Sequence, residues 1–275
     1  MPMNTDAVAD DPPPAGLSDR WPASLLSRIE DAGLNASAPP QQRWVDGWLL
    51  RYNPGKAKRA RCIQPVADGR LPLDERLALC AAVLRDADLP MVVRITPFAR
   101  PAGLDTALAA LGWTPLDDTR VMLATTIPSS APNWPEDLRL ERCAPADFAE
   151  TVGVLRGSSP AQRQAHAERL LQSPVPYRGW VLRQRADDRV VACGQTAAEA
   201  DLVGLYDVFT DPAHRGRGHA RRLCQHLLAH AAADGARMAY LQVDATNHAA
   251  RAIYRGLGFA DAYAYHYRSP DTDAG

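Results

Sequence analysis

Hydrophobic and polar residues follow two different spacings along this chain. Apolar residues three and four positions apart predict helices, whereas short apolar or alternating runs predict strands. The first spacing predicts helices at 21–34, 73–86, 104–111, 145–155, 160–172, 220–233 and 249–256. The second predicts strands at 44–52, 60–66, 91–96, 119–124, 138–142, 177–185, 189–196, 202–209, 238–243 and 259–267. This mixture predicts an α/β fold in which helices flank a central sheet.

The same order of elements occurs twice. In each half a helix, a strand and a short helix lead to a Leu-Gly-aromatic triplet, at 111–113 and at 257–259. Gly112 and Gly258 are 146 residues apart, and the same offset aligns the strands before them. We interpret this as an internal repeat of one α/β unit.

Proline-rich segments divide the chain. The acidic, proline-rich start predicts a disordered tail at 1–20. A first domain then covers 21–126, and a stretch with several prolines predicts a linker at 127–136. The second domain is expected at 137–270.

Composition narrows the classes of function. The formal net charge of −1 over 275 residues gives no indication of nucleic-acid binding. No apolar run approaches 18 residues, so no membrane span is expected, and the N-terminus does not resemble a signal peptide. Five cysteines without C-x-x-C spacing predict free thiols and a cytoplasmic location. His226 and His230 lie four residues apart but lack a third ligand, so no metal site is expected.

The segment 211–220, DPAHRGRGHA, joins a predicted strand to a predicted helix. The first N–H groups of a helix lack intrahelical partners and carry partial positive charge. Glycines allow such groups to converge on one phosphate, and Arg215 and Arg217 add charged donors. The segment is neither a Walker loop nor G-x-G-x-x-G, because Arg221 occupies the third glycine position. It predicts a pyrophosphate site, and the alternative is a helix start with solvated arginines.

Two motifs in this half carry a family resemblance. Arg215-x-x-Gly218-x-Ala220 resembles the first signature of the GNAT family of acetyl-CoA-dependent N-acetyltransferases. Asn247 and the segment ARAIYRGLGF at 250–259 resemble the second. The resemblance covers about 130 residues, from 138 to 267. The whole chain resembles the tandem GNAT arrangement with a degenerate N-terminal copy.

The resemblance assigns roles to residues. It implies acetyl-CoA as co-substrate, Tyr254 as the acid that protonates the departing thiolate, and direct attack by a primary amine in a ternary complex. Tyr177 and Trp180, on a hairpin expected to line the acceptor cleft, are candidate substrate contacts. The residues implied to bind acetyl-CoA are Val208, Phe209, Thr210, Arg215, Gly216, Arg217, Gly218, His219, Ala220 and Asn247.

The general base is not indicated by the motifs. Gly204 and Gln242 occupy the two positions where branches of the family carry a glutamate. Asp207 is the candidate base, although a regular strand would point it away from the Gly204 side. A water relay or an amine that binds already neutral are alternatives, and Asp244 and Glu199 are further candidates.

The first half lacks the matching residues. The 146-residue offset places 69–74 on the phosphate loop, Pro101 on Asn247 and Leu108 on Tyr254. We therefore expect the first half to act by packing against the second. The predicted function is N-acetylation of a small-molecule or peptide amine. The alternatives are a catalytically decayed CoA-binding scaffold and a longer acyl-CoA donor. The acceptor and the oligomeric state are not indicated.

Overall fold

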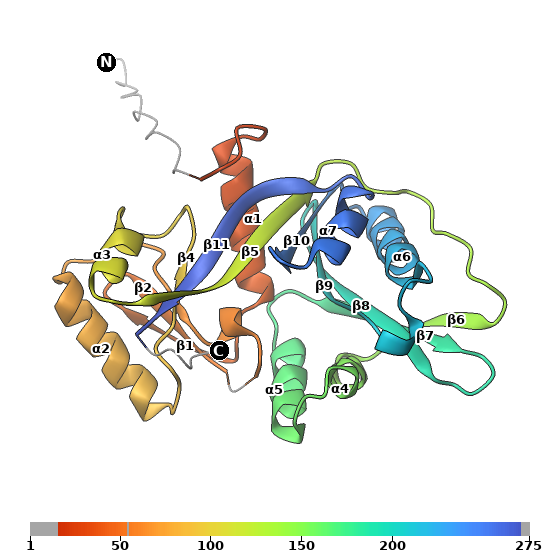
Figure 1. Ribbon diagram of the computed structural model, residues 1–275, viewed down its shortest axis with the longest axis horizontal. Helices are drawn as coiled ribbons and strands as arrows, with labels where there is room; N and C mark the ends of the chain where they lie inside the picture. Colours follow the sequence, from red (N-terminus) through yellow and green to blue (C-terminus); the bar gives the residue numbers. More distant parts are fainter. Residues whose placement is uncertain (1–15, 54, 271–275) are drawn as a thin grey trace, which may run out of the picture.

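The computed structural model describes residues 16–53 and 55–270, which form one eleven-stranded mixed sheet with helices on both faces (Figure 1). The strand order is β1-β2-β3-β4-β11-β5-β10-β9-β8-β7-β6. The predicted α/β class is confirmed. The helices are α1 (Ala23–Ala36), α2 (Leu73–Asp86), α3 (Leu104–Ala110), α4 (Pro145–Leu155), α5 (Pro160–Leu171), α6 (His219–Ala233) and α7 (His248–Arg255), with 3₁₀ turns η1 (Lys58–Ala60) and η2 (Pro212–His214).

The strands are β1 (Gln41–Val45), β2 (Trp48–Tyr52), β3 (Ile63–Gln64), β4 (Val93–Ile95), β5 (Thr114–Ala124), β6 (Leu138–Cys143), β7 (Tyr177–Gln184), β8 (Val190–Glu199), β9 (Leu202–Thr210), β10 (Met238–Asp244) and β11 (Ala260–Ser269). The single strand predicted at 44–52 is wrong, because β1 and β2 form a hairpin. Asp46 and Gly47 at its turn have φ of 40° and 85°. Two consecutive positive φ angles match the twist of a tight hairpin.

The internal repeat is visible in the structure. The same 146 residues separate the starts of α2 and α6 and the starts of β5 and β11. Each half places its last strand inside the other, because β11 lies between β4 and β5 and β5 lies between β11 and β10 (Figure 1). The halves therefore share one hydrogen-bonded sheet, and the domain boundaries drawn from the sequence stay a prediction.

Helices cover the sheet of the second half on both sides. Helix α6 packs on β8 and β9, while α4 packs on β7 from the opposite face (Figure 1). Residues 1–15 of the predicted tail lie outside the described ranges. The end of that prediction is wrong, because Leu17 pairs with Tyr263 and the Ser18 N–H donates to the Ala262 carbonyl at 2.9 Å.

Candidate active site

Strands β9 and β10 begin as a parallel pair and then separate. Their pairing ends at Leu205 and Leu241, although β9 continues to Thr210 and β10 to Asp244. A β-bulge accompanies the separation, since Asp207 and Val208 together stand opposite Gly194 of β8. Asp207 has φ of +50°, which turns its side chain out of the regular alternation. The assumption of a regular strand was therefore wrong, and the bulge positions Asp207 in a cavity.

That cavity has a volume of about 240 Å³ and is lined by both separated strands and by α7. Val208 lines it from β9 and Gln242 from β10, while Asn247 and Tyr254 line it from α7. A bulge leaves backbone groups outside the strand ladder, so this is where an N–H can face a ligand. Phe209 and Thr210 follow the bulge, and the Arg215 Nε donates to the Thr210 carbonyl at 3.3 Å.

The predicted phosphate loop lies at the end of β9, where α6 begins. Gly216 and Gly218 have φ of 75° and 77°, and a Cβ at either would meet nothing within 4 Å. Gly218 is the N-cap of α6 and supplies no side-chain cap to its first N–H groups. Arg215 and Arg217 are exposed and form no ion pair with any residue of the described ranges. Open, uncapped donors beside guanidinium groups that have no carboxylate partner in this part of the structure fit a pyrophosphate.

His219 and Ala220 contribute differently from the arginines. The His219 side chain is buried, and burial lowers its pKa, which favours the neutral imidazole. Its contribution to an anion site is therefore limited to its backbone N–H. Ala220 presents no functional side chain, so its assigned role is also confined to the backbone of the first turn.

Asn247 and Tyr254 frame the cavity from α7. The Asn247 Oδ1 accepts the Ala250 N–H at 3.1 Å, so Asn247 caps this helix. Tyr254 is 9% exposed, and its ring packs edge-on against Phe259 with centroids 6.1 Å apart. Burial raises the pKa of Tyr254 well above its ordinary value. The phenol therefore holds its proton throughout the neutral range.

Asp207 is fully engaged. Its carboxylate accepts from the Arg156 Nη1 at 2.6 Å and from the Gln195 Nε2 at 2.7 Å, with the His166 Nε2 at 3.4 Å. Burial raises its pKa, but Arg156 and His166 lower it more, and the net pKa is well below the ordinary value. Such a carboxylate is a weak base, so the structure opposes the prediction that Asp207 is the general base.

The other base positions hold no free carboxylate. A Cβ at Gly204 would lie 2.4 Å from Tyr206 and 2.7 Å from Tyr240, whose hydroxyls hydrogen-bond each other at 2.8 Å. There is no room for a glutamate on this backbone. The Gln242 Oε1 accepts from the Tyr265 hydroxyl at 2.8 Å.

The two further carboxylates are also bonded. The Asp244 Oδ1 accepts from the Thr246 hydroxyl and from the Thr246 N–H, the latter at 2.7 Å, and these two hydrogen bonds lower the pKa of Asp244. Glu199 accepts from the Asn35 Nδ2 at 3.1 Å and does not line the cavity. Neither is placed as an unoccupied base.

The two predicted substrate residues lie on opposite faces of β7. Tyr177 lines the cavity, and its hydroxyl donates to the Ala36 carbonyl at 2.5 Å. Trp180 packs instead under α6, with its ring centroid 4.9 Å from that of His226 and 5.1 Å from that of His230. The assignment of Trp180 to substrate is wrong, because residues an odd number of positions apart face opposite sides of a strand.

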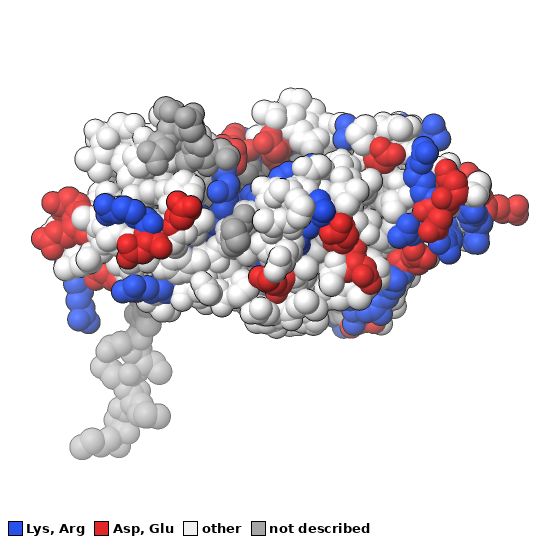
Figure 2. Space-filling view, turned by 90° about the horizontal axis from the view of Figure 1, so that it is seen from below, with Lys and Arg blue, Asp and Glu red and all other residues white. Residues whose placement is uncertain are grey.

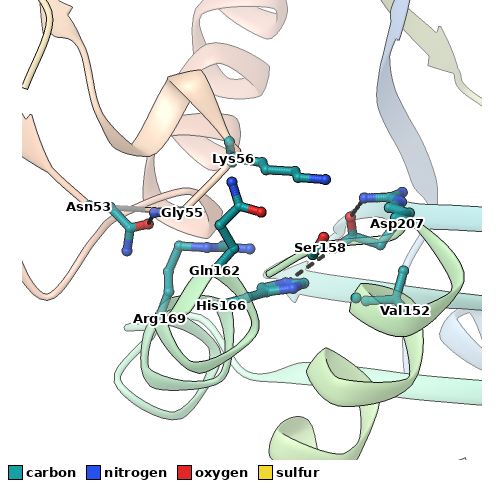
Figure 3. A pocket seen from close by; sticks show the side chains of 12 residues that line it. Asn53, Gly55, Lys56, Val152, Ser158, Gln162, His166, Arg169 and Asp207 are labelled. Atoms are coloured by element: carbon teal, nitrogen blue, oxygen red, sulfur yellow. Dashed lines mark hydrogen bonds and ion pairs between the residues drawn. The ribbon is translucent and has the colours of Figure 1, made fainter. Parts of the chain in front are cut away.

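A second wall of the site comes from the first half of the chain. Lys56, in the loop after β2, faces Ser158, Gln162 and His166 of the second half across a pocket (Figure 3). This pocket shares Asp207 with the cavity between β9 and β10. No motif indicated these residues, although KAKRAR at 56–61 carries four basic residues in six.

In the first half, the loop that aligns with the phosphate loop is already occupied by a side chain of the protein. At the start of α2 the Asp46 carboxylate accepts the N–H groups of Arg70 (2.9 Å) and Leu71 (3.0 Å) and pairs with Arg76 at 2.8 Å. An internal carboxylate therefore takes the place that a phosphate would occupy. A Cβ at Gly69 would lie 2.1 Å from the same carboxylate, so this loop has no open space.

The comparison with protein families identifies this site. Residues 148–259, which include the bulge, the phosphate loop and α7, match the acetyltransferase (GNAT) family model. Residues 148–259 form a GNAT acetyltransferase domain. GNAT enzymes use acetyl-CoA as co-substrate. The open glycine loop at α6 fits the co-substrate's pyrophosphate, whereas the occupied loop at α2 does not.

Proteins similar to this chain extend over most of its length. The uncharacterized N-acetyltransferase YobR of Bacillus subtilis is 26% identical over 230 residues, 82% of this chain and 91% of the relative. A GCN5-related N-acetyltransferase structure from Kribbella flavida has a TM-score of 0.64 at 17% identity and covers 89% of this chain and 95% of that one. A tandem GNAT protein from the clavulanic acid biosynthesis pathway has a TM-score of 0.57 at 14% identity, covering 74% and 70%.

Other classes of site are not apparent. The described residues include no group of three or more His, Cys, Asp and Glu that could hold a metal ion. Within the same ranges, no helix is both long and apolar enough to traverse a membrane. The five cysteines are free thiols, as the sequence predicted.

Proposed function

We propose that this enzyme transfers the acetyl group of acetyl-CoA to a primary amine by direct attack in a ternary complex. One observation carries the proposal: groups from both substrate sides line a single cavity. Val208, Asn247 and Tyr254 come from the co-substrate side, whereas Arg59 comes from η1 of the first half and Tyr177 from β7. Two substrates that meet in one cavity can react without a covalent enzyme intermediate.

Different groups of the chain have different roles in this reaction. The backbone N–H groups at 216–220 and the guanidinium groups of Arg215 and Arg217 hold the pyrophosphate. The backbone at the Val208 bulge can donate a hydrogen bond to a carbonyl oxygen that gains negative charge. Tyr254 holds a proton at the edge of the same cavity and donates it to the departing sulfur. The bound co-substrate supplies the activated acetyl thioester.

The missing base has a physical explanation. Arg59 and Arg169 line the cavity beside the engaged Arg156–Asp207 pair. Positive charge near an amine disfavours its ammonium form and lowers its pKa. The positive electrostatic field of the cleft therefore promotes deprotonation of the acceptor amine. Water, rather than a carboxylate, accepts the proton. An acceptor that binds already neutral needs no dedicated base.

The second candidate is a CoA-binding scaffold without chemistry. The engagement of Asp207 by Arg156 and Gln195 is the observation that favours it. A scaffold has no need of a protonated phenol, and Tyr254 at the cavity edge favours the enzyme. A longer acyl chain on CoA is a variant of the first proposal.

Thiol release from acetyl-CoA, measured against a panel of amines, tests the proposal. For the best acceptor, reciprocal plots at several acetyl-CoA concentrations should intersect, as direct attack in a ternary complex requires. Parallel lines or an isolable acetyl-enzyme would contradict the mechanism. Tight acetyl-CoA binding with no release for any amine would favour the scaffold.

A further inference from the structure

The cleft between the halves carries an excess of positive charge. Three adjoining recesses share lining residues and together form what we call the basic cleft. Lys and Arg side chains are visible between the halves near the middle of the face in Figure 2. The basic residues that line the cleft are Lys56, Lys58, Arg59, Arg61, Arg156 and Arg169, and the acidic ones are Asp117, Asp207 and Asp244.

Two of the acidic residues are already neutralised. Lys58 pairs with Asp117 at 2.7 Å, and Arg156 pairs with Asp207 at 2.6 Å. Four cationic side chains then face a single carboxylate, that of Asp244. The cleft is thus strongly basic in a protein whose net charge is −1.

Arg59 and Arg169 are the notable members of the cleft. The Arg59 Nη1 donates to the Tyr265 hydroxyl at 3.0 Å, and its Nε is buried without an acceptor in the described part of the chain. Arg169 is 7% exposed and donates only to neutral oxygens, the Ala36 carbonyl at 3.3 Å and the Tyr177 hydroxyl at 3.5 Å. Within the described ranges, neither guanidinium has a carboxylate within 4 Å. A largely buried guanidinium without an anion is costly.

We propose that the acceptor is a small amine that also carries a carboxylate or phosphate, and that Arg59 and Arg169 bind this anionic group. The inference rests on the proposed function, because it assumes that the basic cleft receives the acceptor. A guanidinium can donate two parallel hydrogen bonds to either anion. Both arginines line the same cavity as Tyr254, so the anionic group and the reacting amine belong to one molecule of modest length.

Matched pairs of amines test the proposal in the full-length protein. Phosphoethanolamine is compared with ethanolamine, and β-alanine with β-alaninamide, with spermidine as a cationic amine. We expect kcat/KM to be about tenfold or more higher for the anionic member of a pair. The two pairs distinguish phosphate from carboxylate. An equal or higher kcat/KM for the neutral amines, for spermidine or for an acidic peptide than for the anionic small amines would overturn the proposal.

Substitutions locate the effect. Arg59→Gln should raise KM for the anionic acceptor about tenfold and leave KM for the neutral acceptor nearly unchanged, because only the anionic acceptor loses a charged contact. Any fall in kcat through loss of positive charge near the amine should be the same for both acceptors. Lys56 is exposed, so Lys56→Gln should fold normally and raise the same KM only about two- to threefold. Arg28→Gln, which removes a surface arginine paired with Asp201, is the control for net charge. Unchanged KM in Arg59→Gln and Lys56→Gln would overturn the assignment.

A binding measurement separates this inference from the proposed function. If no amine releases CoA, calorimetry with phosphoethanolamine and ethanolamine still decides the question. Binding of the phosphorylated amine alone, lost in Arg59→Gln and weakened about two- to threefold in Lys56→Gln, would support an anion site in a protein without transferase activity. Absence of binding would overturn the inference even if other amines were acetylated.

Discussion

Tyr254 is the side chain on which the assignment of a general acid depends. We expect Tyr254→Phe to lower kcat about 10²-fold or more while leaving acetyl-CoA affinity nearly unchanged, because only proton donation is lost. Because burial raises the pKa of Tyr254 well above its ordinary value, this phenol does not set the alkaline limb of the pH–rate profile. The alkaline limb should therefore persist in the variant. Tyr52→Phe, in the other half, serves as the control for loss of a phenol. Full activity in Tyr254→Phe, or loss of the alkaline limb, would contradict this account.

Asp207 is expected to matter for stability more than for catalysis. Its pKa is lowered in the folded protein, so its ion pair stabilises the fold above the unfolded pKa near 3.8, and this contribution disappears as pH falls through the folded pKa. Asp207→Asn should lower the free energy of unfolding at pH 7 by about 1–3 kcal/mol, after allowance for partial exposure of Arg156.

Urea unfolding of wild type and Asp207→Asn at pH 7 and pH 3 measures this effect. The difference between the two proteins should shrink at pH 3, because the Asp207 carboxylate of the unfolded chain gains a proton below about 3.8 while the folded one remains ionised. The kcat of the variant should fall less than about tenfold. A loss of several orders of magnitude with a shifted acidic limb would restore Asp207 as the base.

At the level of elements, Asn247 has two positions of interest: it caps helix α7, and it lines the co-substrate site. Asn247→Ala should cost about 1 kcal/mol through loss of the cap and should also raise KM for acetyl-CoA. Ser159→Ala removes a comparable cap from α5, where Ser159 accepts the Gln162 N–H at 3.3 Å. It should lower the urea midpoint similarly and leave KM unchanged. An equal effect of both variants on KM would reduce Asn247 to a cap alone.

The elements that could be predicted from sequence are those encoded locally. Amphipathic spacing placed α2 and α6 to within a residue at their starts, and the glycines at 216 and 218 indicated the anion loop. The bulge at Asp207 could not be predicted, because it depends on the pairing of β9 with β8. The face of β7 on which Trp180 lies also depends on how that strand packs in the sheet, so the sequence did not indicate it. The basic cleft could not be predicted from the sequence, because Lys56 and Arg59 reach the site only through tertiary packing.

At the scale of the whole molecule, the exchanged strands make the halves interdependent. Strand β5 of the first half pairs with β10 and β11, so a fragment of residues 127–275 would leave two strand edges open. We expect the full chain to unfold in one transition, with far-ultraviolet circular dichroism and tryptophan fluorescence coinciding. The separate fragment should be insoluble or unfolded, and coexpression with residues 1–126 should restore it. Two separated transitions would show that the halves are independent.

Titration of the full-length protein with acetyl-CoA in a calorimeter tests the central claim most directly. We expect one molecule bound per chain, at the open loop before α6, because Asp46 fills the equivalent position before α2. Gly218→Asp should abolish binding, since its carboxylate would repel the phosphates. Gly112→Asp, at a glycine with nearly the same φ of 83° and equally open surroundings, should leave binding intact. Two molecules per chain, or undiminished affinity in Gly218→Asp, would contradict the account.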